Sequence, residues 1–425
     1  MNATQFLQIA RQQISTDPRT RLTAPTMAAL DDPNCLVDVH SHIFDKKSLN
    51  IPYILLRLSK SKLGLEAVSA GLLGKTEEEI YKDIKSKKLN KNTDWEDLEA
   101  ELEMMESVEL FGMELSDALK VLRKASMQEI LDLYLETFAI NQLPEFSNHP
   151  FATGILLMDL ETGWEMKSKK KYYEQVEEVR EISKIRPIIP FFSVDPRRAD
   201  ETDPNKNLYD LFIKAFVNET PYFGVKCYPS LGYLPSDARL DPIFQICAEK
   251  NIPVLTHCGG ETVSTFKKKI PVRNSTGEIQ FTIPGKNRTE RANWLNNPAH
   301  WDMVLEKHKN LKLNLAHFGG DTNWELLGNS GSSERVEKII DMMRNPNWKV
   351  YADFSFNVVE EELYNAFQNQ LDNNADVKSR TLYGTDYWVV LPKGDLLAKQ
   401  SRFLTQMVNH QASLLQSVPR AYLGI

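Results

Sequence analysis

Histidines and one aspartate stand where short apolar runs of this sequence end. His40 and His42 close the first run, His257 and His317 close two later runs, and Asp386 follows the last. Neutral imidazole and carboxylate groups are the ligands of catalytic zinc sites, which keep one position open for water. If the fold brings these five residues together, they could perform metal-assisted attack by water.

The spacing of the first pair is suited to a shared ligand. In Asp38-Val-His-Ser-His the two histidines are separated by one residue. Alternate side chains of a strand face the same side, so His40 and His42 can both point at one ion. A His-x-His pair alone is weak evidence, because paired histidines are often ordinary surface residues. A shared metal site therefore requires that four separate strand ends converge.

The elements that must position these residues are short β-rich runs with helical stretches between them. Several runs are nearly continuous in apolar residues, as expected for strands covered on both faces. Strands that alternate with helices form parallel βαβ units, and eight of them favour a closed (β/α)8 TIM barrel with its active site at the carboxyl ends of the strands. The predicted strands are Cys35–His40, Phe151–Leu157, Ile188–Val194, Tyr222–Cys227, Ile252–His257, Leu311–His317, Val350–Phe354 and Thr381–Gly384.

Two connections in this pattern are unusually long. Residues 43–150 show helical periodicity and leave from the carboxyl end of the first strand, so we expect a helical insertion that roofs the active site; the alternative is a peripheral helical bundle. Residues 258–297 contain glycine, proline and polar clusters and predict a loop that borders the site. The expected organisation is an N-terminal segment with the first strand (1–42), the insertion (43–150) and the remainder of the barrel (151–425).

The ordered set of His-x-His, His, His and Asp resembles the amidohydrolase superfamily. The local sequences GVKCYPSLGY, THCGG, AHFGGD and YGTDYW are similar to the branch that includes amidohydrolase-related hydrolases and non-oxidative decarboxylases. The resemblance covers roughly 35–60 and 150–425 and does not extend to the helical insertion. As a set these motifs are highly specific.

The resemblance implies one divalent metal ion, usually zinc and sometimes manganese, held by His40, His42, His257 and Asp386. Such an ion lowers the pKa of its water towards ~7 and so gives hydroxide at neutral pH. Asp386 can bind the metal, accept the proton of the water and pass it to the leaving group. His317 is then free to polarise the scissile carbonyl or to stabilise the developing oxyanion.

Lys226 ends the fourth predicted strand, and two interpretations of it are open. In binuclear relatives a lysine at this strand end is carbamylated and bridges two metals, and His257 and His317 would then serve the second ion. Alternatively, Lys226 stays an ammonium group that bonds carboxylates or orients the substrate. Many mononuclear relatives share this type of strand, so we favour the ammonium form and a single ion.

Other residues are weaker candidates for the substrate pocket. Arg197 and Arg198 follow the third strand, and an arginine could hold an acidic substrate, although a structural ion pair is the more ordinary role. Tyr228 and Arg291 lie in segments after the fourth and fifth strands, where they could line the pocket. Asp353 ends the seventh strand and could orient a ligand histidine.

Composition limits the class of protein. The chain has 425 residues, a formal net charge of −7 and four scattered cysteines, which favours a cytoplasmic protein with reduced thiols and no nucleic-acid partner. No apolar run approaches the roughly 20 residues that span a bilayer, so we expect no membrane partner. The expected partner is a small-molecule substrate, and association of the chain into a homo-oligomer is left open.

Three functions follow from these observations. The first is hydrolysis of an amide or another C–N or C–O bond. The second is decarboxylation or hydration of an unsaturated or aromatic acid by a lyase of the same superfamily. The third, a barrel that only binds or scaffolds, predicts a broken metal set, and the set here is complete.

Overall fold

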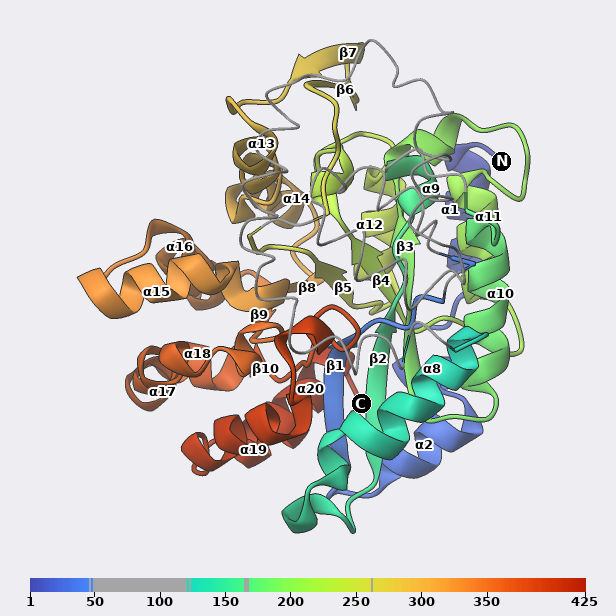
Figure 1. The fold of residues 1–425 in the computed structure, drawn as a ribbon. Helices are drawn as coiled ribbons and strands as arrows, with labels where there is room; N and C mark the ends of the chain where they lie inside the picture. The colour runs from blue at the N-terminus through green and yellow to red at the C-terminus, as the bar shows by residue number, and fades with distance from the viewer. Residues whose placement is uncertain (46, 49–120, 122–123, 164–167, 261–262) are drawn as a thin grey trace, which may run out of the picture.

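Eight strands form one parallel sheet that curls into a barrel in this computed structural model, which describes residues 1–45, 47–48, 121, 124–163, 168–260 and 263–425 (Figure 1). Each strand pairs with the next one in the barrel in parallel register. In order around the sheet the strands are β1 (Leu36–Ser41), β2 (Phe151–Leu156), β3 (Ile188–Val194), β4 (Gly224–Cys227), β5 (Val254–Thr256), β8 (Lys312–Leu315), β9 (Lys349–Asp353) and β10 (Thr381–Leu382).

Backbone hydrogen bonds close the barrel between its first and last strands. Val39 N donates to the Tyr383 carbonyl at 3.1 Å, and Asp386 N donates to the His40 carbonyl at 2.8 Å. A parallel bridge between Ser41 and Tyr387 continues the seam. The eight runs predicted from the sequence are therefore the eight strands, and the expected (β/α)8 barrel is confirmed.

The strands are apolar on both faces because the barrel has two cores. In β3, Ile189 and Phe191 pack inward against Leu255 of β5. The alternate residues Ile188 and Phe192 join the outer core, where the surrounding helices lie. Burial on both sides explains why these strands appear in the sequence as continuous apolar runs rather than as alternating patterns.

The amino ends of the strands are plugged by apolar side chains. The helices α2 (Ala24–Asp31) and α20 (Val418–Leu423) supply Leu30 and Tyr422 to the inner core. The Tyr422 hydroxyl also donates to the Val254 carbonyl at 3.0 Å. The polar strand-end residues therefore gather at the opposite, carboxyl end of the barrel.

Helices surround the sheet on its outer face (Figure 1). Their apolar residues recur at helical spacing; in α16, for example, Val336, Ile339, Ile340 and Met343 are buried and make one stripe. The longer helices of this outer layer are α10 (Tyr172–Ser183), α11 (Leu208–Phe216), α12 (Asp241–Glu249), α15 (Asp321–Ser330), α16 (Glu334–Arg344), α17 (Tyr364–Asn373) and α19 (Leu396–Gln406). At the amino terminus, α1 (Ala3–Gln13) packs against this layer, with Phe6 stacked on Tyr209 of α11.

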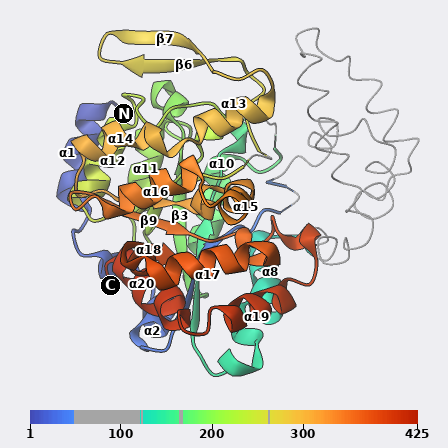
Figure 2. The same ribbon diagram turned by 90° about the vertical axis from the view of Figure 1, so that its left-hand side faces the viewer.

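The segment after β5 is more regular than the predicted loop, and that part of the prediction was wrong. It contains an antiparallel hairpin of β6 (Lys269–Asn274) and β7 (Gly277–Thr282), followed by α13 (Arg288–Leu295). The hairpin projects from the barrel at the top of both views (Figures 1 and 2). Ile270 and Val272 anchor it in a small separate apolar cluster, whereas most of β7 is exposed.

Most of the predicted insertion lies outside the described residues, so the expected roof stays a prediction. Its described end carries α8 (Met127–Leu133), which begins at the capping residue Ser126. This helix packs beside the barrel near β2, and its backbone continues as a π-helical turn over Tyr134–Phe138. Within the described part of the chain, no helix is long and apolar enough to cross a membrane.

Candidate metal centre

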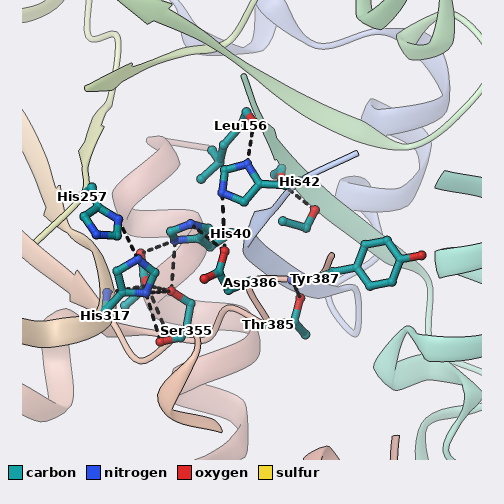
Figure 3. A network of polar contacts seen from close by, with 12 residues as sticks. His40, His42, Leu156, His257, His317, Ser355, Thr385, Asp386 and Tyr387 are labelled. Carbon is teal, nitrogen blue, oxygen red and sulfur yellow. Dashed lines mark hydrogen bonds and ion pairs between the residues drawn. The ribbon is translucent and has the colours of Figure 1, made fainter. Parts of the chain in front are cut away.

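Three of the predicted ligands form one buried cluster at the carboxyl ends of β1 and β10 (Figure 3). The Oδ1 atom of Asp386 lies 3.4 Å from the Nε2 atom of His40 and 3.4 Å from the Nε2 atom of His42. All three side chains are buried. Their potential ligand atoms lie within 4.8 Å of one another, close enough to contact a single ion.

An irregularity in β1 aims the two histidines. Val37 and Val39 point into the inner core, so strict alternation would turn His40 outward. The pairing of β1 with β2 shifts register between Asp38 and Ser41. A bulge of this kind re-aims the following side chains, and both His40 and His42 reach the centre of the barrel mouth.

Both strand-1 histidines are oriented through Nδ1. His42 Nδ1 lies 2.8 Å from the Leu156 carbonyl, which can only accept, so this nitrogen carries the proton. His40 Nδ1 lies 3.0 Å from Ser355 Oγ and 3.3 Å from Asp353 Oδ2. With Nδ1 as the donor, each ring presents an unprotonated Nε2 to Asp386, as a metal-binding histidine must.

The cluster is suited to a divalent cation. His40 Nε2 and Asp386 Oδ1 are both buried and have no hydrogen-bond partner. Burial raises the pKa of Asp386, while His40 and Lys226 oppose that shift, and burial lowers the pKa of His42 well below its ordinary value. Unpartnered buried polar atoms are costly. A cation bound by two imidazole nitrogens and a carboxylate would satisfy them, and this donor set is typical of zinc.

The other two histidines lie beside this cluster and contact each other. His257 follows β5 and His317 follows β8; His257 Nδ1 is 3.0 Å from His317 Nε2. The His317 ring is tilted against that of His40, with centroids 4.9 Å apart. Burial lowers the pKa of His317 to about 3 and also lowers the pKa of His257, so both rings are neutral. The structure thus brings all five residues together, but it groups His257 with His317 rather than directly with the ligand cluster.

Asp353, at the end of β9, organises the inner side of the site. It accepts hydrogen bonds from His317 N at 3.1 Å, Asn314 Nδ2 at 2.7 Å and Ser355 N at 3.2 Å. Burial alone would raise the pKa of Asp353, but His40 and the bound hydroxyl of Ser355 outweigh it, and the pKa lies below its usual value. Asp353 therefore contacts His40 as the sequence suggested for a carboxylate that orients a ligand.

Ser355 was not predicted as a site residue. Its hydroxyl lies 3.0 Å from both His40 Nδ1 and His317 Nδ1 and bonds to Asp353. The sequence Asp-Phe-Ser at the end of β9 repeats the alternation that identified His40 and His42. The same argument from alternate residues, applied to the seventh strand, could have found Ser355.

A second carboxylate holds β1 against the segment that carries Asp386. Asp38 accepts from His40 N at 2.9 Å, from Thr385 N at 3.1 Å and from Thr385 Oγ1 at 2.6 Å. The Tyr134 hydroxyl, from the end of the insertion, donates to the same carboxylate. Burial raises the pKa of Asp38 to about 6, partly offset by these bonds. Asp38 thus fixes the spacing between two candidate ligands without facing the ion.

Unusual backbone conformations gather around the site. Among the described residues, seven non-glycine residues have positive φ, and five of them follow β8, β9 or β10. These five are His317, Phe318, Phe356, Asp386 and Trp388. Positive φ is costly for most side chains, and such strain is typical of functional sites. Gly384 shows how tightly the site is packed, since a Cβ there would lie 2.7 Å from the His40 Cβ.

Lys226 points into the same region from β4. It is fully buried, and its Nζ has no hydrogen-bond partner and lies 5.6 Å from the centre of the Tyr228 ring. Burial lowers the pKa of Lys226 to about 8, although Asp353 and Asp386 act in the opposite direction. The side chain is therefore placed where it could act on a bound molecule.

The weaker substrate candidates lie in different surroundings, and only some of them are close to the histidines. Arg197 bonds Asp195 at 2.8 Å through Nε, and Arg198 makes ion pairs with Asp159 and Glu161, so the structure places both arginines in structural ion pairs. Tyr228 stacks on the ring of His257, with centroids 4.2 Å apart. The fourth candidate, the arginine at position 291, is buried in α13.

Apolar side chains border the cluster. Phe44 stacks on His42 at a centroid distance of 5.1 Å, and Trp388 meets Phe44 edge-on at 6.0 Å. Phe44 and Tyr228 belong to a small apolar cluster with Met158 from the end of β2. This border makes one side of the site apolar.

A closed parallel barrel with a buried histidine–aspartate cluster at the carboxyl ends of its strands defines the class of metal-dependent barrel enzymes. Residues 214–414 match the family model described as Amidohydrolase. The match includes Lys226, His257, His317 and Asp386 and begins after β1. This match over residues 214–414 agrees with the resemblance that the sequence motifs indicated.

Solved structures with a similar fold are distant in sequence. A TIM-barrel protein from Bordetella bronchiseptica is 17% identical, covers 71% of this chain and 86% of its own, and has a TM-score of 0.42. An amidohydrolase from Burkholderia multivorans with bound zinc is 12% identical, with 73% and 93% covered and a TM-score of 0.43. 4-Oxalomesaconate hydratase from Rhodopseudomonas palustris is 11% identical, with 92% and 95% covered and a TM-score of 0.44. No curated protein matches the sequence. Likenesses at this level carry no argument about the reaction.

Proposed function

We propose that this chain is a hydrolase that holds one divalent ion, zinc, and cleaves an amide or another C–N or C–O bond of a small molecule. The observation that carries the proposal is the pair of buried, unpartnered ligand atoms His40 Nε2 and Asp386 Oδ1, 3.4 Å apart. His42 completes the cluster, and His257 is proposed as the fourth ligand because the family resemblance implies it. Manganese is the alternative ion.

The chain's own groups supply the acid–base steps. When bound, a divalent cation lowers the pKa of a water molecule and polarises a carbonyl oxygen. Asp386 has an unpartnered oxygen facing His40 and His42, so it can accept a proton from an attacking water and return it to the leaving group. Asp38 keeps this carboxylate in place through its bonds to the preceding residue, Thr385.

The hydrogen bonds of His317 suggest a role different from the one first expected. Its Nδ1 lies 3.2 Å from the Ser355 carbonyl, which can only accept, so the proton of the neutral ring is on Nδ1. Its Nε2 then carries a lone pair, which faces His257 Nδ1 at 3.0 Å and accepts from it. His317 therefore acts first as a proton acceptor, and it can stabilise an oxyanion only after it has taken up a proton.

One observation favours the second candidate, a decarboxylase or hydratase of the same superfamily. Lys226 Nζ is buried without a hydrogen-bond partner, and a substrate carboxylate would provide one. Arg197 and Arg198, which we considered for this purpose, are engaged in ion pairs with the protein's own carboxylates. An acidic substrate would accordingly be held by Lys226.

A substrate screen separates the two candidates. We expect the zinc-loaded protein to hydrolyse members of a panel of small amides and lactones, and to leave unsaturated and aromatic acids unchanged. The Asp386→Ala variant, assayed in parallel, should be inactive on the same compounds. Release of carbon dioxide from the acids, or their hydration, without turnover of any amide or lactone would replace the hydrolase with the lyase.

We further propose that the insertion 43–150 covers the site and selects the substrate. The chain enters the insertion directly after His42, and Lys170 holds its first residues by bonding Asp45 and the Lys47 carbonyl. Replacing residues 49–120 with a short linker should leave a folded, zinc-binding barrel with a changed order of preference in the substrate panel. Circular dichroism and the panel measure both properties; an unfolded product, or unchanged kinetics, would contradict this role.

The cysteines support a cytoplasmic location. Cys35, Cys227, Cys247 and Cys258 are all free and buried. Unpaired thiols are typical of proteins kept in a reducing compartment. We therefore propose a cytoplasmic enzyme whose partner is its small-molecule substrate.

A further inference from the structure

One hydroxyl group connects the two functional halves of the site. Ser355 Oγ is fully buried and contacts His40 Nδ1 at 3.0 Å, His317 Nδ1 at 3.0 Å and the Asp353 carboxylate (Figure 3). His40 belongs to the ligand cluster, whereas His317 belongs to the pair with His257. Ser355 thus lies between a ligand and the proposed proton acceptor and contacts the imidazole rings of both.

The direction of each bond follows from counting protons. A serine hydroxyl has one proton and two lone pairs. Asp353 already accepts from the backbone of His317 and Ser355 and from Asn314, so its oxygens are acceptors and the serine proton goes to it. Ser355 Oγ must then accept from both imidazoles, and each of the two rings carries its proton on Nδ1.

The backbone provides an independent check on one of these assignments. The Ser355 carbonyl lies 3.2 Å from His317 Nδ1, and a carbonyl oxygen cannot donate. His40 Nδ1 likewise has a second acceptor, the Asp353 carboxylate at 3.3 Å. For both rings the shorter Nδ1 contact is the one of 3.0 Å to Ser355 Oγ.

We propose that Ser355 is a positioning residue that keeps the protons of His40 and His317 on Nδ1, so that His40 presents a free Nε2 to the metal and His317 presents an unprotonated Nε2 to His257. This inference rests on the proposed metal site and adds the residue that prepares it. In free histidine the neutral ring prefers the proton on Nε2, so the protein must impose the opposite tautomer. Gly384 keeps the geometry tight, since a Cβ at that position would lie 3.0 Å from the Ser355 Cβ.

The first test uses the metal-free protein and needs no substrate. With ¹⁵N-labelled histidine, two-bond nitrogen–proton correlation spectra distinguish the two neutral tautomers of each ring. We expect Nδ1–H signals for His40 and His317 in the wild type, assigned by their loss in His40→Gln and His317→Gln. In Ser355→Ala each ring loses its shorter Nδ1 acceptor, so the Nε2–H form should appear for both His40 and His317.

The second test measures zinc affinity by competition with a chromophoric chelator. Loss of a group that orients a ligand typically weakens metal binding about 10- to 100-fold, and we expect this change in Ser355→Ala. Ser355→Cys, whose thiol is only a weak acceptor, should give an intermediate dissociation constant and covers the case in which the alanine variant does not fold. The matched control is Ser183→Ala, which removes a buried hydroxyl bonded to the Arg180 carbonyl at 2.7 Å.

The outcomes separate this proposal from a general packing role and from the proposed function. Equal loss of zinc affinity in Ser355→Ala and Ser183→Ala, or an unchanged His40 tautomer in Ser355→Ala, would overturn the role of Ser355. A wild type that binds no zinc would overturn the proposed metal site. The tautomers of the metal-free protein would still be measurable in that case, so the two failures can be told apart.

Discussion

Replacing His40 or Asp386 with alanine is expected to remove the bound metal and to lower turnover by at least about 10³-fold, because acid–base catalysis alone contributes about 10²- to 10⁴-fold. His40 Nε2 and Asp386 Oδ1 are the two unpartnered atoms of the cluster. Removing either leaves an incomplete ligand set. Metal content per chain after gel filtration and turnover on the substrate found in the panel are the measurements.

The control for this pair is a histidine outside the site. His300 bonds the Trp294 carbonyl at 2.7 Å and lies on the segment before α14 (Asp302–Lys307). His300→Ala should retain both metal and turnover. Full metal occupancy in His40→Ala and Asp386→Ala would show that the ion, if present, is held elsewhere.

The second large effect concerns Lys226, which we expect to be an unmodified ammonium group beside a single ion. Lys226→Ala should keep about one metal per chain and weaken kcat/KM by about 10- to 100-fold, the loss expected for a charged hydrogen bond worth about 1.5–3 kcal/mol. Burial lowers the pKa of Lys226 only to about 8, so at pH 7 the amine is still mostly protonated. Only the neutral amine takes up carbon dioxide, so the prevalence of the ammonium form favours a single ion. Metal analysis and steady-state kinetics test this expectation.

The binuclear alternative predicts different results. Two ions per chain in the wild type, falling to one or none in Lys226→Ala and restored by short carboxylic acids, would establish a carbamylated bridge. Lys214→Ala is a suitable control, because Lys214 lies on α11 and bonds the exposed Asn205. It should change neither the metal count nor the kinetics.

Much of the fold follows from local patterns. Each barrel strand is a short apolar run followed by a helix, and β3 has the predicted bounds because burial on both faces makes its run continuous. Parallel strands place their carboxyl ends on one rim. That geometric rule brought His40, His257, His317 and Asp386 together although they come from distant parts of the sequence.

The remaining features depend on tertiary contacts that the sequence pattern does not encode. The hairpin β6–β7 contains Pro271 and three lysines at its start, which indicate a loop, yet burial of Ile270 and Val272 stabilises it. The alternation in His-x-His correctly predicted that His40 points into the barrel mouth. That orientation depends on the register shift in β1, which the sequence pattern does not reveal.

The hydrogen bonds and ion pairs of individual side chains also could not be predicted from the sequence pattern. Arg198 pairs with Asp159, and this contact depends on how the segments after β2 and β3 lie side by side. Ser355 acquires its position only because β1, β8 and β9 meet at the same point. A single sequence identifies the residues capable of chemistry more readily than the residues that orient them.

The most direct test of the account is anomalous diffraction at the zinc edge from crystals of the zinc-loaded protein. The account predicts one strong peak per chain at the mouth of the barrel, within coordination distance, about 2.0–2.2 Å, of Nε2 of His40, Nε2 of His42 and a carboxylate oxygen of Asp386. A peak at any other place would contradict the proposed metal centre. So would the absence of a peak in crystals grown from protein that carried one zinc ion per chain in solution.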